Sequence, residues 1–118
     1  MNMKTLVALL TLGLVQIAAA NDEIPVFTIV IEAHLFRPNP LIVPAHQKFK
    51  LQIVNKDDTP EEFDSFDLNR EKVIYPRNSA ILFIGPLPPG DYYYFGEYHP
   101  SVSNGFIQVS ERAQHVDQ

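Results

Sequence analysis

The chain has 118 residues, no cysteine, no tryptophan and a formal net charge of −5 at pH 7, and its length fits one small domain. The absence of cysteine excludes a disulfide scaffold, a thiolate metal centre and thiol catalysis. Acidic residues outnumber basic ones and no basic cluster is present, so binding to nucleic acid or to an anionic membrane surface is not expected.

The first twenty residues have the composition of a secretory signal peptide. Lys4 precedes an apolar run from Leu6 to Ile17, and three alanines at 18–20 supply the small residues of a cleavage site. The alternative is a retained anchor, but the run is short for a membrane span. We therefore predict a periplasmic protein with no direct membrane insertion after cleavage. Its expected parts are a signal peptide at 1–20, a folded domain at 21–112 and a polar tail at 113–118, with a net charge of −6 from eight basic and fourteen acidic residues.

The rest of the chain alternates short apolar segments with turns and shows no sustained helical periodicity. The clearest segment is 49–55, where apolar and polar residues alternate and one face is expected to be buried. Prolines stand mainly at segment ends, where a missing N–H does least harm. The expected strands are 26–32, 41–44, 49–55, 63–68, 72–74, 79–84, 92–95 and 106–109. Seven or eight strands at this spacing predict an all-β sandwich or barrel.

The end of the chain combines an aromatic segment, a loop that ends in a histidine, and a last strand. An aromatic segment at 91–95 leads into a loop that ends at His99 and Pro100, and a last strand follows at 105–109. Blue-copper proteins carry a cysteine thiolate in that loop, and here its place falls on Gly96. With the other segments of the chain taken in order, the mature part resembles the cupredoxin superfamily. These segments are Phe36-Arg37-Pro38, Val43-Pro44-Ala45, Asn55-Lys56-Asp57, Thr59-Pro60-Glu61-Glu62-Phe63, Gly90-Asp91-Tyr92 and His99-Pro100. The resemblance implies a cupredoxin-like Greek-key β-sandwich of seven or eight strands.

Four further segments resemble one branch of that superfamily. They are Glu62-Phe63-Asp64-Ser65, Glu71-Lys72-Val73-Ile74, Ile84-Gly85-Pro86-Leu87 and Gly90-Asp91-Tyr92. The branch is the cysteine-free periplasmic cupredoxin-like component of bacterial ferrous iron uptake, the FtrB type, with the cupredoxin domain of EfeO as a distant relative. The implied partners are an iron permease, a periplasmic metal-binding protein and a membrane ferredoxin-like component. The chain departs from the branch at Gly96, where an acidic residue is usual, at His46, and in the turn at Pro76 and Arg77, where glycine is usual.

Candidate metal ligands lie near the loop that ends at His99. Glu97 is two residues before His99, so both side chains can reach one ion from one loop. Glu62 follows the Thr-Pro turn, near the place of the first histidine ligand of blue-copper proteins, and His34 lies in the first strand connection. For each of these residues, the alternative to a metal ligand is an ordinary hydrogen-bonded or solvated side chain. We expect Glu62, Glu97, His99 and His34 to be metal ligands, and Glu61 to point to the other side of its strand and be solvated.

Other polar residues are expected to have ordinary roles. His46 and His115 are expected at the surface, the pair Asp57 and Asp58 in a turn, and the aromatic run 92–95 in packing.

Imidazoles combined with carboxylates suit Fe(II), Mn(II), Zn(II) or non-blue Cu(II). The expected cofactor is thus a metal ion, with iron first and copper or manganese as alternatives, and type 1 blue copper is excluded. The expected function is to bind Fe(II) and deliver it to the permease. Two possibilities stay open: the protein oxidises the iron, or it only carries it. The alternative is a metal-free interaction module that docks a membrane complex. No hydrolase motif is present.

Overall fold

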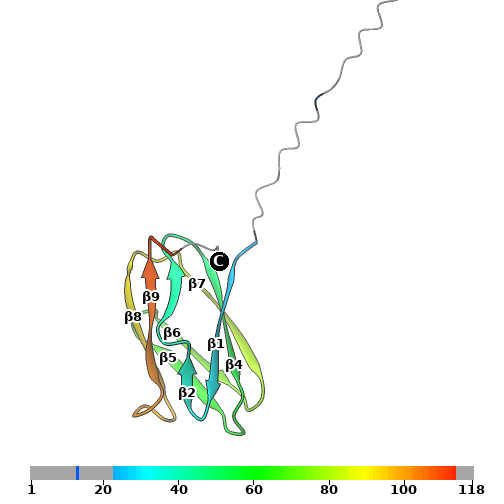
Figure 1. The fold of residues 1–118 in the computed structure, drawn as a ribbon. Coiled ribbons are helices and arrows are strands. Elements are labelled where there is room, and N and C mark those ends of the chain that lie inside the picture. Colours follow the sequence, from blue (N-terminus) through cyan, green and yellow to red (C-terminus); the bar gives the residue numbers. More distant parts are fainter. Residues whose placement is uncertain (1–12, 14–22, 114–118) are drawn as a thin grey trace, which may run out of the picture.

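The computed structural model describes residue 13 and residues 23–113. Within them the chain forms nine strands and no helix, arranged as two facing sheets (Figure 1). The four-stranded sheet has the order β2-β1-β4-β7, with β1 Val26–Glu32, β2 Leu35–Arg37, β4 Phe49–Asn55 and β7 Ser79–Ile84. The five-stranded sheet has the order β3-β9-β8-β5-β6, with β3 Leu41–Pro44, β5 Glu61–Ser65, β6 Arg70–Ile74, β8 Gly90–Gly96 and β9 Asn104–Ser110. The predicted all-β sandwich is confirmed.

The core lies between the two sheets and follows the period of two expected of half-buried strands. In β4, Phe49, Leu51 and Ile53 are fully buried, as the sequence predicts. On neighbouring strands of the five-stranded sheet, the rings of Phe63 and Tyr94 lie 5.1 Å apart between centroids. Phe36, Phe63 and Tyr94 together form a buried aromatic group. This packing fixes the ends of β5 and β8, from which the candidate ligands come.

The strand count differs slightly from the predicted seven or eight. The additional strand is β2, three residues long, which pairs antiparallel with β1. So short a segment cannot show an alternating pattern, and its pairing depends on β1. A second difference concerns β5, which begins at Glu61 and ends at Ser65 rather than covering 63–68. The Ser65 hydroxyl accepts from the Leu68 amide and donates to the Tyr93 carbonyl, which closes a turn where the strand was expected to continue.

Three connections meet at one end of the sandwich, the lower end in Figure 1. They are the β1–β2 turn, the β4–β5 connection and the β8–β9 loop. Apart from Gly13, the expected signal peptide lies outside the described residues, as does His115. Among the residues that are described, no helix is long and apolar enough to cross a membrane.

Candidate metal centre

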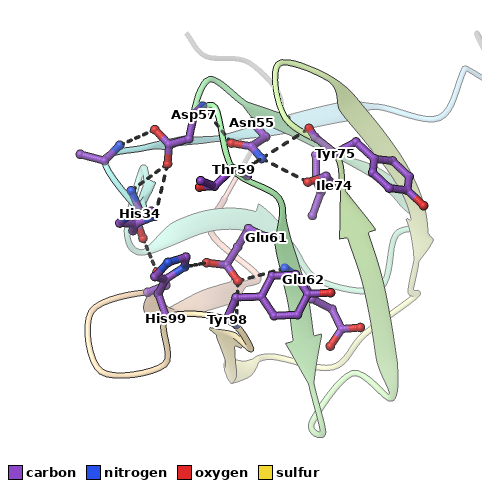
Figure 2. A network of polar contacts seen from close by, with 12 residues as sticks. His34, Asn55, Asp57, Thr59, Glu61, Glu62, Ile74, Tyr75, Tyr98 and His99 are labelled. Atoms are coloured by element: carbon purple, nitrogen blue, oxygen red, sulfur yellow. Dashed lines mark hydrogen bonds and ion pairs between the residues drawn. The ribbon is translucent and has the colours of Figure 1, made fainter.

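Glu61 is the buried charge at this end of the molecule, with only 2% of its surface exposed. Its Oε1 accepts hydrogen bonds from the backbone amides of Glu62 and Tyr98, both at 2.9 Å. Its Oε2 lies 2.7 Å from the His99 Nδ1. A buried carboxylate is stable only when it is paired and hydrogen-bonded, and both oxygens of Glu61 have partners (Figure 2). The expectation that Glu61 is solvated is therefore wrong.

Gly96 makes room for that carboxylate. A Cβ atom at position 96 would lie 2.8 Å from the Glu61 Cδ and 2.7 Å from the Ser103 Cβ, too close for either group. Glycine is required at position 96 for lack of space rather than for its backbone conformation, because the Gly96 backbone is not in the left-handed region. Where the resemblance places a thiolate in blue-copper proteins, this chain has a glycine with the Glu61 carboxylate packed against it.

His99 is held by the β8–β9 loop, which folds back on itself. The amides of Val102 and Ser103 both donate to the His99 carbonyl, and the His99 amide donates to the Gly96 carbonyl. The buried Ser103 hydroxyl donates across to the His34 carbonyl and so joins this loop to the β1–β2 turn. The His99 side chain stays about one-third exposed, so it is open to solvent on one side.

His34 lies against His99, with ring centroids 3.7 Å apart and an interplanar angle of 18°. Its position depends on a turn in which Ala33 and His34 both have positive φ, at 51° and 66°. The Asp57 carboxylate holds that turn by accepting from the amides of Ala33 and His34 at 2.8 and 2.9 Å. Burial raises the pKa of Asp57, but the two amide donors together with the charges of His34 and His99 outweigh burial and leave the pKa below its ordinary value.

Asn55 holds Asp57 in place through a hydrogen bond to its backbone. It is almost fully buried, its Oδ1 accepts from the Asp57 amide, and its Nδ2 donates to the carbonyls of Thr59 and Ile74. This side chain ties the β4–β5 connection to β6. The expectation of turn chemistry at Asp57 and Asp58 is borne out, and Asp58 forms a surface ion pair with Arg77.

The resulting inner cluster consists of His34, Glu61 and His99. One possible ligand atom from each side chain lies within 4.8 Å of the others. Two of the four expected ligands, His34 and His99, thus lie close together, and their role as ligands stays a prediction. Glu61 joins them because it points to the inner face of β5, whereas its neighbour Glu62 points to the outer face. Phe63 is the one large apolar residue of β5. Since it points into the core, the residues two positions away, Glu61 and Ser65, point inward as well.

The other two expected ligands, Glu62 and Glu97, lie in an outer cluster with Asp64, in which one oxygen from each residue is within 4.8 Å of the others. Figure 2 shows the Glu62 carboxylate pointing away from Glu61 and His99. Burial and the neighbouring charge of Glu62 raise the pKa of Asp64. The hydrogen bond with Asp64 is the main cause that raises the pKa of Glu97. The structure thus does not bring Glu62 and Glu97 together with His99.

The remaining expectations on polar and aromatic residues hold where the structure describes them. His46 is exposed and pairs with Glu111 at 2.9 Å. In the aromatic run, Tyr94 packs in the core, whereas Tyr93 and Phe95 stack at 6.0 Å on the outer face of the five-stranded sheet.

The profile of the Cupredoxin-like domain family matches residues 5–109. The chain therefore belongs to this family. An uncharacterized protein, RP394 of Rickettsia prowazekii (strain Madrid E), is 45% identical over 91 residues, which is 77% of this chain and 73% of that protein. The FtrB-type assignment within the family stays a prediction.

Solved structures with the same fold include auracyanin B and amicyanin. Auracyanin B superposes with a TM-score of 0.61 at 15% identity, over 75% of this chain and 92% of that one. A reduced Cu(I) form of an amicyanin mutant gives a TM-score of 0.58 at 16% identity, over 79% of this chain and 88% of that one. At such identity the likeness shows the fold alone.

A type 1 copper centre does not fit the residues of this chain. Such a centre needs a cysteine thiolate with two histidines, and the chain has no cysteine. The space beside Gly96 is filled by the Glu61 carboxylate. The donor set is instead two imidazoles and one carboxylate.

Proposed function

We propose that this chain is an exported protein that binds a divalent transition metal ion between His34, Glu61 and His99, and that the ion is ferrous iron on its way into the cell. The observation that carries the proposal is the convergence of three ligand atoms within 4.8 Å, from the β1–β2 turn, the start of β5 and the β8–β9 loop. Chain segments more than twenty residues apart supply them, so local turn chemistry alone does not account for the group.

The chemistry of the inner cluster favours a borderline metal. Two imidazoles and one carboxylate form the set that non-haem Fe(II) centres use with open coordination positions, and the same set accepts Mn(II), Zn(II) or Cu(II). The His99 Nδ1 and the Glu61 Oε2 face each other at 2.7 Å. Binding one ion through both atoms requires the proton between them to leave, so affinity falls as the pH falls. Since the His34 and His99 rings are nearly parallel, a shared ion also requires one ring to turn.

Iron as cargo agrees with the accessibility of the cluster. The side chains of His34 and His99 are 38% and 31% exposed, whereas Glu61 is buried, so the cluster opens to solvent only through its imidazoles. An ion that must be passed on needs such an open side. The resemblance to the FtrB-type branch supports an iron permease and a periplasmic metal-binding protein as the partners in this transfer. Oxidation of the bound iron is a further step that carboxylate ligation would favour.

Calorimetric titration of Fe(II) under anaerobic conditions, and of Mn(II), tests the site. We expect Glu61→Gln and His99→Ala to weaken binding at least tenfold. His46→Ala is the matched control, because it removes an exposed imidazole outside the cluster and is expected to leave the affinity unchanged. Equal affinities in all four proteins would refute the site. Copper-loaded protein is expected to lack the intense absorption of a copper–thiolate centre near roughly 600 nm.

The role in iron uptake needs its own test, because the site could bind metal for another purpose. Deletion of the gene is expected to lower Fe(II) uptake in iron-poor medium, and the wild-type gene, but not Glu61→Gln, is expected to restore it. If Glu61→Gln also restores uptake, then iron uptake does not depend on metal binding at the inner cluster.

One observation favours a second function, that of a metal-free interaction module. Glu61 already has three hydrogen-bond donors, so its burial is explained without an ion. The outer face of the five-stranded sheet also carries a row of ring contacts that joins Phe66, Phe95, Tyr93 and Phe106. Phe66 is 84% exposed, as expected of a surface that a partner covers. The titration above decides between the two functions.

A further inference from the structure

We propose that the outer cluster of Glu62, Asp64 and Glu97 is a second cation site, which binds a hard, oxygen-preferring cation such as Ca²⁺. This site goes beyond the proposed function and does not depend on the inner cluster. It lies on the opposite face of β5, where Glu62 is the neighbour of Glu61 in the sequence.

The backbone places the three carboxylates on one face. Glu62 and Asp64 are two residues apart on β5, and alternate residues of a strand face the same way. Asp64 lies opposite Phe95 in the pairing of β5 with β8, and Glu97 is two residues beyond Phe95. The Glu97 amide donates to the Glu62 carbonyl at 2.8 Å, which continues the pairing and fixes the loop beside the strand.

The cluster contains acceptors and no cationic partner. Asp64 is only 9% exposed, and its Oδ1 has no hydrogen-bond partner. Within residues 23–113, none of the three carboxylates forms an ion pair with a lysine, arginine or histidine. A buried carboxylate oxygen without a donor is unfavourable. Asp64 is thus a nine-tenths-buried carboxylate with one oxygen that lacks a donor, and it lies beside two other carboxylates. A cation that completes the group explains this arrangement.

The donor set indicates which cation fits. Carboxylates without imidazole or thiolate suit hard ions rather than copper or zinc. Ca²⁺ has oxygen ligands at about 2.3–2.6 Å, so ligands on opposite sides of it lie roughly 4.6–5.2 Å apart. The three ligand oxygens of the outer cluster lie within 4.8 Å of one another, which is close enough for them to share one such ion.

Terbium luminescence provides a direct test, with Tb³⁺ as the probe and Ca²⁺ as the competitor. Tyr98 is a built-in sensitiser, because its ring lies beside Glu62 (Figure 2) and its hydroxyl is acted on by the charges of Glu62 and Asp64. We expect saturable, tyrosine-sensitised emission that Ca²⁺ displaces, and at least a tenfold loss of Tb³⁺ affinity in Asp64→Asn. Glu97→Gln changes an exposed residue, so it tests the same site without risk to the fold.

Two controls make the outcome decisive. Asp91→Asn removes an exposed carboxylate from the same sheet face and is expected to leave Tb³⁺ affinity unchanged. His99→Ala alters only the inner cluster and is expected to do the same. Equal Tb³⁺ affinity in wild type, Asp64→Asn and Glu97→Gln would overturn the proposal, as would an equal loss in Asp91→Asn, which would indicate diffuse surface charge.

Discussion

Glu61 and Glu62 are neighbours on β5, but their carboxylates lie in opposite environments. The inner carboxylate is buried and accepts from two amides and a histidine. The outer one stands among other carboxylates, one of which has an oxygen without a partner. The comparison shows that burial of charge alone does not mark a site. The two carboxylate groups differ in their hydrogen-bond donors. Both oxygens of Glu61 have donors, whereas one oxygen of Asp64 in the outer cluster has none.

Removal of the inner carboxylate is expected to have the largest effect on stability. Glu61→Ala leaves two amides and a histidine without an acceptor, so we expect a loss of about 3 kcal/mol in the free energy of unfolding. Glu62→Ala is the matched control, and its expected effect is within about 0.5 kcal/mol. Urea unfolding of both variants measures the difference. Equal losses would mean that the two carboxylates are not distinguished in the way the structure shows.

Gly96→Ala is expected to break the inner cluster without changing any ligand. The new Cβ would lie 2.7–2.9 Å from atoms of Ser103 and Glu61, so one of them must move. Overpacking of this kind costs about 1–3 kcal/mol. We also expect weaker metal binding, because the Glu61 carboxylate is displaced from His99. Calorimetry and urea unfolding on the same variant separate the two effects, and unchanged stability would contradict the close packing at Gly96.

The fold could be predicted from the sequence because strands with one buried face show their period directly. The alternation in β4 and the aromatic segment of β8 were visible without coordinates. The short β2 was not, since three residues carry no period and the strand exists only through its pairing with β1. The end of β5 was missed because the Ser65 hydroxyl, a tertiary partner of Tyr93, closes the turn.

The candidate site was only half predictable. His34 and His99 could be expected to lie together, because their loops meet in the sandwich expected from the resemblance. The burial of Glu61 was not expected, because a shift of one residue in a strand moves each side chain to the other face. The sequence shows that Gly96 stands where blue-copper proteins have a cysteine, but only the structure shows that its missing Cβ gives space to a carboxylate.

Asp57→Asn is expected to have a smaller effect on the inner cluster. An amide oxygen can replace part of the carboxylate that accepts from Ala33 and His34, so we expect a loss of about 1 kcal/mol at pH 7. The pKa of Asp57 is lowered in the folded protein, so its stabilisation is present above the unfolded pKa of about 3.9 and is lost as the pH falls through the folded pKa. Asp58→Asn, which affects only a surface pair, is expected to change little. Thermal unfolding from pH 7 to pH 2 measures both, and a pH-independent loss in Asp57→Asn would contradict the ionised hydrogen-bond acceptor.

The smallest expected effect has the opposite sign and belongs to the outer cluster. Asp64→Asn removes one of three crowded charges, so without a cation the variant is expected to be more stable than wild type at pH 7, by about 0.5 kcal/mol. The pKa of Asp64 is raised in the folded protein. Its stabilising contribution is therefore complete below the unfolded pKa of about 3.9 and is lost as the pH rises through the folded pKa.

The gain from Asp64→Asn should therefore disappear as the pH is lowered to about 3, where the wild-type carboxyl is protonated. Thermal unfolding in a chelating buffer at pH 7 and pH 3 measures this, and added Ca²⁺ at pH 7 is expected to raise the Tm of wild type above that of the variant. A variant less stable than wild type in the chelating buffer would mean that Asp64 has donors the structure does not contain. In that case the contrast between the two faces of β5 would not hold.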